Sequence, residues 1–268
     1  MTASKKSKAA TVVGVQNVFG GAGATSIVAG LAVALCAIEH RAIAIDLNRD
    51  NSLCLHFGME PTENQGIISA LHNGSALLDI TFESRSGYPF IPMGMTSEER
   101  HISETAEDDM DKLADLFAPL FAKQERFLII DLPTEPSALQ RWAYRQCDLV
   151  LNIVRPEPRL IRGLSRYLVD TAPRQVDAEA HSYLLLNGVA PQVVLQRDSM
   201  DFIRGQIADG RLVPLMVNSD QHVPEAFAQR CPVRTYQPKA QAARDFDALA
   251  LWVVHEVAER SVAIVEDA

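Results

Sequence analysis

Lysine is scarce in this 268-residue chain, and its few copies are unevenly placed. No lysine lies between Lys8 and Lys112, although arginines occur within that interval. Acidic residues outnumber basic ones, and the formal net charge is −9. A negative protein is repelled by the phosphate backbone, so we expect no direct contact with nucleic acid as the main role.

Long apolar runs and paired cysteines are missing as well. The longest apolar stretch, residues 27–38, is about half the length that crosses a bilayer, and it begins too far from the first residue for a signal peptide. The four cysteines are scattered and form no C-x-x-C pair: Cys36, Cys54, Cys147 and Cys231. We therefore expect a cytoplasmic protein without a disulfide framework or a zinc site.

The composition, 47% hydrophobic and 22% charged, is that of a globular domain. No linker or internal repeat divides the chain. We predict a flexible basic arm at residues 1–9, one domain at 10–262 and an acidic tail at 263–268. The terminal helical pattern lacks the basic face that anionic lipid attracts, so membrane association is expected to be indirect.

Apolar runs alternate with helical patterns along the chain. Strands are predicted at 11–16, 42–45, 90–92, 127–131, 149–154, 183–186 and 212–217. Helices are predicted at 25–39, 52–57, 67–73, 103–123, 158–171, 199–208 and 239–260. Strands that are apolar without alternation are buried on both faces, which is typical of a parallel sheet between two layers of helices. The pattern thus predicts an α/β fold with a mostly parallel central sheet.

A glycine-rich loop joins the first strand to the first helix. Its residues are Gly20, Gly21, Ala22, Gly23, Ala24, Thr25 and Ser26. Glycines let an anion approach the backbone closely, and a helix N-terminus offers N–H groups and a positive dipole end to a phosphate. The standard phosphate-binding pattern, G-x-x-x-x-G-K-[ST], has Ala24 at the position of its lysine.

Two other interpretations of the loop remain open. It is compatible with a tight turn that binds nothing. It also nearly fits the dinucleotide pattern G-x-G-x-x-G at Gly21, Gly23 and Ser26, with Asp46 near the expected ribose-binding acid. Asp131 also has two interpretations. It is a turn or helix-capping acid, or it is an acid that holds Mg²⁺ through water, as its place at the end of an apolar strand indicates. The loop, Asp46 and Asp131 together favour a nucleoside triphosphate with Mg²⁺.

Taken together, these residues resemble the MinD/ParA family of deviant Walker A ATPases over nearly the whole chain. The family's loop reads K-G-G-x-G-K-[ST]-[ST], and residues 19–26 align with it. Asp46 stands where the family's switch I begins, and Asp131 with Pro133 resembles its Walker B and switch II segment. The resemblance implies a three-layer P-loop NTPase fold, ATP and Mg²⁺ as cofactors, and metal contacts from Thr25, Asp46 and Asp131.

The same resemblance implies further contacts with the nucleotide. Glu157 is similar to the glutamate that reaches a ribose across the dimer, and Asn187 to the asparagine that recognises adenine. Pro214 resembles the proline of the family's base-binding loop. A homodimer with ATP between its subunits is therefore expected.

Three departures from the family pattern bear on hydrolysis. Ala24 replaces the lysine that bridges the β- and γ-phosphates, and Phe19 replaces the lysine that reaches the partner's nucleotide. Asn48 replaces a second switch I aspartate, which leaves Asp46 and Asn48 as the only catalytic candidates. Since phosphoryl transfer depends on positioning and charge neutralisation, we expect ATP binding with slow or absent hydrolysis.

The loop lacks lysine in the pattern G-G-x-G-x-T, and the second half of the chain contains the segments 131–133 (DLP), 212–215 (LVPL) and 232–236 (PVRTY). In these features the chain resembles one branch of the family, the BcsQ proteins of bacterial cellulose-synthase operons. This resemblance implies a regulatory subunit that works with a small accessory protein and the cytoplasmic parts of a membrane cellulose synthase complex. Recruitment to the inner face of the cytoplasmic membrane is expected through those partners. The alternatives are an active ParA/MinD-type ATPase that positions DNA or a cell-pole structure, and an NAD(P)-binding oxidoreductase.

Overall fold

The computed structural model describes residues 10–95, 107–158, 164, 167, 181–207 and 210–266, with the backbone alone at 107–108 and 260–266. Within these residues the strands are β1 (Thr11–Asn17), β2 (Arg41–Asp46), β3 (Phe82–Glu83), β4 (Pro89–Ile91), β5 (Arg126–Asp131), β6 (Leu149–Val154), β7 (His181–Val189) and β8 (Leu212–Asn218). The α-helices are α1 (Ala24–Ala37), α2 (Ile67–Asn73), α3 (Glu107–Phe121), α4 (Ala138–Gln146), α7 (Val194–Gln206), α8 (His222–Ala228), α9 (Val233–Tyr236) and α10 (Gln241–Glu266). Two short 3₁₀ helices are η1 (Leu53–Phe57) and η2 (Leu77–Ile80).

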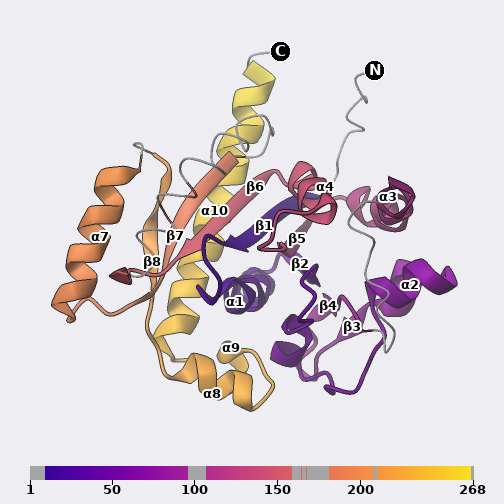
Figure 1. Ribbon diagram of the computed structural model, residues 1–268, viewed down its shortest axis with the longest axis horizontal. Coiled ribbons are helices and arrows are strands. Elements are labelled where there is room, and N and C mark those ends of the chain that lie inside the picture. Colours follow the sequence, from indigo (N-terminus) through magenta and orange to yellow (C-terminus); the bar gives the residue numbers. More distant parts are fainter. Residues whose placement is uncertain are drawn as a thin grey trace.

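The described strands form one sheet in the order β3-β4-β2-β5-β1-β6-β7-β8 (Figure 1). Every neighbouring pair is parallel except β3 and β4. Helix α7 lies beyond β8 at one end of the sheet, and α2 and α3 lie at the other end. The predicted mostly parallel sheet between helices is confirmed.

Both faces of the sheet are buried, as the unalternating strands predict. Val13 and Val15 of β1 enter a core cluster that includes residues of α1 and α10. Val12 enters a second cluster on the opposite face, with residues of α2, α3 and α4. A third cluster packs α7 against β6, β7 and β8. Residues that alternate along one strand therefore serve opposite layers, which gives the three-layer arrangement.

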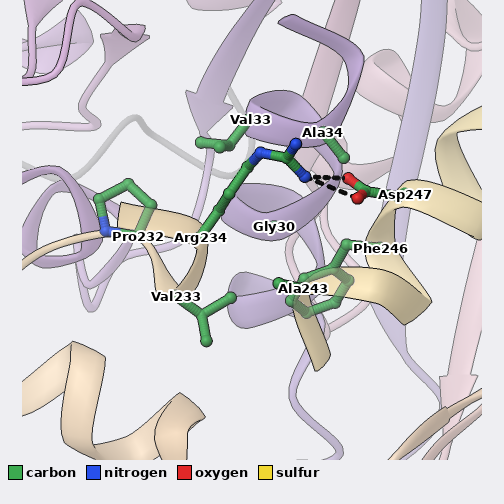
Figure 2. Close-up of a pocket in the computed structure, with 9 residues that line it drawn as sticks. All are labelled: Gly30, Val33, Ala34, Pro232, Val233, Arg234, Ala243, Phe246 and Asp247. Atoms are coloured by element: carbon green, nitrogen blue, oxygen red, sulfur yellow. Dashed lines mark hydrogen bonds and ion pairs between the residues drawn. The ribbon is translucent and has the colours of Figure 1, made fainter. Parts of the chain in front are cut away.

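Helix α1 is buried along most of its length and packs closely against α10. A Cβ built on Gly30 would lie 2.3 Å from a ring carbon of Phe246, so only glycine permits this approach. Figure 2 shows both residues in the wall of a small cavity between α1, α9 and α10. Arg234 forms an ion pair with Asp247 at its edge. The glycine-loop helix is thus anchored to the C-terminal helix.

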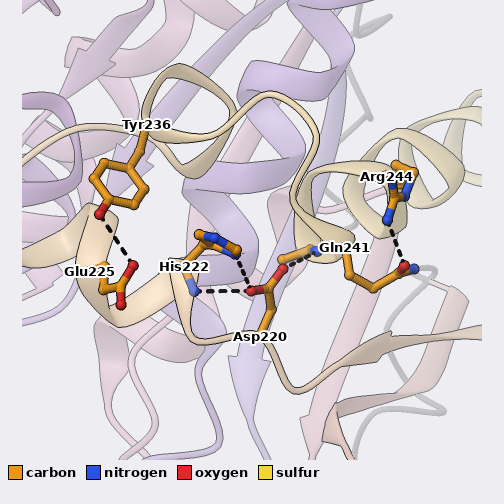
Figure 3. Close-up of polar contacts among 7 residues, drawn as sticks. Asp220, His222, Glu225, Tyr236, Gln241 and Arg244 are labelled. Carbon is orange, nitrogen blue, oxygen red and sulfur yellow. Dashed lines mark hydrogen bonds and ion pairs between the residues drawn. The ribbon is translucent and has the colours of Figure 1, made fainter.

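The segment after β8 is held by one carboxylate. Asp220 accepts the backbone N–H of His222 and that of Ala242, each at 2.9 Å (Figure 3). The first bond lies at the start of α8 and the second at the start of α10. Asp220 therefore links two helix N-termini, whose first N–H groups have no partner within their own helices.

Several elements differ in extent from the predictions. Strand β7 continues past residue 186 to Val189, and α7 begins at Val194 rather than at residue 199. The hairpin of β3 with β4 and the short helices α4, α8 and α9 were not predicted. Each is shorter than the window over which a periodic pattern can be recognised.

Some predictions fall on residues outside the described part. They are the basic arm at 1–9, the start of the helix predicted at 103–123, and most of the helix predicted at 158–171. Helix α10 runs to Glu266, so the expected tail at 263–268 begins within it. Among the described helices, none has the length and apolar character that a membrane span needs.

Candidate functional site

The glycine loop lies between the end of β1 and the start of α1. Gly21 and Gly23 have φ angles of +81° and +97°, which residues with a Cβ rarely adopt. No atom lies within 4 Å of a Cβ built on Gly20 or Gly21, so this flank of the loop is open. A Cβ on Gly23 would lie 2.5 Å from Nδ2 of Asn187, so the loop requires glycine there.

Two asparagines hold the loop in place. Oδ1 of Asn17 accepts the N–H of Ala24 at 2.9 Å, and Nδ2 of Asn187 donates to the carbonyl of Ala22 at 2.7 Å. The Ala24 methyl group is buried in the core cluster shared with α1. The loop is thus fixed from β1 and from β7, and it delivers the N-terminus of α1 to the open flank, where an anion is favoured.

Asp46 and Asp131 end the neighbouring strands β2 and β5 in register with each other. Asp46 is completely buried, and its two oxygens accept the N–H groups of Asn48 at 2.9 Å and Leu53 at 3.0 Å. Both oxygens of Asp46 are thus occupied by backbone donors, so these contacts give no direct support to its role as the ribose-binding acid of the dinucleotide interpretation. The metal role of Asp46 stays a prediction.

Asp131 has a different environment. It is 1% exposed, and neither carboxylate oxygen has a hydrogen-bond partner in the described part of the chain. It is therefore not the capping or turn acid of the alternative interpretation; Oγ of Ser137 accepts the Gln140 N–H and caps α4 instead. A buried carboxylate without partners is costly unless a cation or a proton compensates it.

Burial also shifts the pKa values of both acids. Burial, the largest cause, raises the pKa of Asp46 to about 7. Burial and then the charge of Asp46 raise the pKa of Asp131 well above its usual value, while the side chains of Thr25 and Asn48 lower it in part. Thr25, Asn48 and the two acids therefore face one another at the start of α1.

A magnesium ion fits this set of residues. Mg²⁺ prefers oxygen ligands and keeps several waters, so one hydroxyl and one or two carboxylates beside a phosphate suffice. The unpartnered carboxylate of Asp131 next to Thr25 supplies that chemistry. Within the described residues there is no group of three or more His, Cys, Asp or Glu side chains that would hold a metal by themselves.

The remaining predicted contacts lie farther along the sheet. Oε1 of Glu157 lies 3.1 Å from Nε of Arg155, just beyond the end of β6. Asn187 lies at the loop, as described above, and its contact with adenine stays a prediction. Ser26 follows Thr25 in the first turn of α1, and Phe19 is 43% exposed on the loop.

Pro214, which resembles the proline of the family's base-binding loop, lies within the strand predicted at residues 212–217. It is the third residue of β8, an edge strand, and it is exposed. An edge strand tolerates proline because the missing N–H faces no neighbouring strand. The loop that follows β8 begins at Ser219, and the contact of Pro214 with the base stays a prediction.

Sequence reasoning missed three polar residues near the site. Asn17 holds the loop. Gln16 in β1 and Asn152 in the adjacent strand β6 form a hydrogen bond with each other. The available signal was a polar residue inside or at the end of an otherwise apolar strand, where burial requires a hydrogen-bond partner.

The sequence of the chain is similar to known proteins of one family. A family model described as cellulose biosynthesis protein BcsQ matches residues 10–254. The BcsQ of Salmonella typhimurium LT2 is 26% identical over 256 residues, covering 94% of this chain and 98% of its own. The BcsQ of Escherichia coli K12 is 28% identical over 247 residues, covering 90% and 93%.

A solved structure is similar in fold. The septum site-determining protein MinD of Pyrococcus horikoshii OT3, complexed with Mg-ADP, superposes with a TM-score of 0.66 at 20% identity. The alignment covers 91% of this chain and 96% of that one. At this identity the likeness concerns the fold, and it confirms the MinD/ParA-like architecture.

Proposed function

This chain belongs to the BcsQ family of cellulose biosynthesis proteins, and from this premise we propose that it is an ATP-binding regulatory subunit of a bacterial cellulose synthase secretion complex. ATP with Mg²⁺ is held between two copies of the chain and is hydrolysed slowly or not at all. One observation carries the proposal: the carboxylate of Asp131 is buried without a partner beside Thr25, where the glycine loop opens α1.

The roles in nucleotide binding follow from the positions of the residues. The backbone of residues 20–26 would bind the phosphates, and Thr25, Asp46 and Asp131 would hold Mg²⁺. When bound, Mg²⁺ neutralises phosphate oxygens and the two carboxylates. Asn187 would meet the adenine, and Glu157 would reach the ribose of the partner's nucleotide. Pro214 of β8 would also contact the base.

Weak hydrolysis follows from what surrounds the phosphates. Ala24 is buried and uncharged where the family has its bridging lysine, and Phe19 offers no charge to a partner. Removing one transition-state donor slows catalysis by roughly 10²–10³. Asn48 faces Asp131 and is able to orient a water, but it carries no negative charge. Binding is affected less, because backbone N–H groups and the helix dipole remain.

The family supports the biological setting. Relatives of the same length are named for cellulose biosynthesis. We propose that the dimer acts in the cytoplasm on a small accessory protein and on the cytoplasmic parts of the synthase complex. In this proposal the membrane is reached through these partners and not through a helix of the chain.

Calorimetric titration with ATP, ADP and NADH tests the proposal, followed by light scattering with and without ATP-Mg²⁺. We expect ATP to bind, NADH not to bind, and the mass to double with ATP-Mg²⁺. Thr25→Ala should lose Mg²⁺-dependent ATP binding. Thr11→Ala, at the opposite end of β1, should not. Tight binding of NADH without binding of ATP would overturn the proposal, as would multiple rapid turnovers of ATP by the wild type.

A further inference from the structure

Two buried polar side chains and a half-buried serine form a row across the centre of the sheet, on the face that α4 covers. Nε2 of Gln16 in β1 donates to Oδ1 of Asn152 in β6 at 2.5 Å. Nδ2 of Asn152 donates to Oγ of Ser182 in β7 at 2.6 Å, and to the Tyr183 carbonyl at 3.2 Å. Gln16 and Asn152 are 3% and 0% exposed, so neither is hydrogen-bonded to bulk water.

Gln140 of α4 connects this row to the segment that follows Asp131. Its Nε2 donates to Oε1 of Gln16 at 3.4 Å and to the carbonyl of Pro133 at 3.1 Å. Pro133 lies two residues beyond Asp131, on the path from β5 to α4. The row therefore ends on the backbone next to the unpartnered carboxylate.

The direction of the hydrogen bonds is the same at every link. The amide of Gln140 donates to Gln16, Gln16 donates to Asn152, and Asn152 donates to Ser182. Consecutive hydrogen bonds of this kind polarise one another. Removing one side chain leaves its buried partner without a hydrogen bond. Apolar residues of similar size would have filled these positions without that requirement. The row thus specifies one arrangement of β1, β6, β7 and the Pro133 segment.

We propose that Gln140, Gln16 and Asn152 are positioning residues of the Mg²⁺-nucleotide site. They hold the Pro133 segment so that the carboxylate of Asp131 faces Thr25, and they link that segment to Ser182 at the far side of β6. The hydroxyl of Tyr167 lies 3.5 Å from Oγ of Ser182 at the end of the row. This inference rests on the proposed binding of ATP-Mg²⁺.

The test compares ATP affinity with and without Mg²⁺ in four proteins: wild type, Gln140→Leu, Gln140→Glu and Gln146→Leu. Gln146 is the matched control, because it lies on α4 and donates to the Trp142 carbonyl within that helix. Both Gln140 variants remove the donor to Pro133. We expect the gain in affinity from Mg²⁺ to fall about fivefold, as for one lost hydrogen bond. Gln146→Leu should keep the wild-type gain.

Hydrogen exchange of the backbone at residues 132–137 supplies a second readout, expected to be faster in the Gln140 variants alone. Gln140 is only partly buried, and thermal unfolding verifies that each variant is folded. An unchanged gain from Mg²⁺ in both Gln140 variants would overturn the inference. If Mg²⁺ did not increase the ATP affinity of wild type, the proposed function itself would be overturned.

Discussion

Asp46 and Asp131 stand opposite each other at the ends of β2 and β5, but only one of them is satisfied by the protein. Asp46 accepts two backbone N–H groups, whereas Asp131 has no hydrogen-bond partner among the described residues. Since both are buried, ionising both would place two like charges side by side in a medium of low dielectric constant. With both acids ionised the empty site is therefore unfavourable, and a divalent cation would stabilise it.

The stability of the metal-free protein should depend on pH through this pair. Burial raises the pKa of Asp46 from 3.8 to about 7 and raises that of Asp131 well above 3.8. Between the unfolded pKa of 3.8 and the raised pKa values in the folded state, the folded protein binds more protons than the unfolded chain. The free energy of unfolding therefore falls as pH rises through this range. Urea denaturation without Mg²⁺, from about pH 5 to about pH 8, measures this fall.

Asp131→Asn provides the comparison for that measurement. The variant cannot carry the buried charge, so its free energy of unfolding should exceed that of wild type by a margin that grows with pH. Parallel pH profiles for the two proteins would show that Asp131 is not destabilised in the fold.

Restoring the missing lysine should increase hydrolysis. Ala24→Lys places a cation at the family's bridging position, and we expect the rate of phosphate release to rise at least about tenfold. Ala24→Met is the control, because it has similar length and no charge and should leave the rate unchanged. Equal rates in both variants would mean that the missing charge does not limit turnover.

Replacing Gly30 of α1 and Gly205 of α7 by alanine should change the stability of the protein in opposite directions. A methyl on Gly30 meets the ring of Phe246 at 2.3 Å, so Gly30→Ala should destabilise the protein by about 1–3 kcal/mol. Nothing lies within 4 Å of a Cβ on Gly205, so Gly205→Ala should stabilise α7 by up to about 1 kcal/mol. Urea denaturation measures both, and a loss in Gly30→Ala no larger than in Gly205→Ala would refute the close packing of α1 on α10.

Removing the carboxylate of Asp220 should weaken two helices at once. Asp220→Ala leaves the N–H groups of His222 and Ala242 without their acceptor, at about 1 kcal/mol for each lost cap. Asp79→Ala is the control, because Asp79 accepts the N–H of Ala76 at an exposed site. Equal changes in the free energy of unfolding for the two variants would contradict the role of Asp220.

The local parts of the site could be predicted from the sequence. The apolar runs that become β1, β2 and β5 are strong signals, and the glycine loop and the acids at strand ends follow directly from them. The resemblance also identified Asn187, which the structure places against the loop. These features depend on neighbours in the sequence or on a motif.

What could not be predicted depends on residues far apart in the chain. The bond between Gln16 and Asn152 spans 136 residues, and Asn187 reaches Ala22 over 165. Only the packing of the strands brings such pairs together.

The central claim is that this chain holds ATP through Mg²⁺ on Thr25 and Asp131 without the family's lysines. Calorimetric titration of wild type and Asp131→Ala with ATP, each with Mg²⁺ and with a chelator, tests it most directly. We expect wild type to bind ATP more tightly with Mg²⁺ and Asp131→Ala to lose this difference. Equal affinities of the two proteins in Mg²⁺ would contradict it.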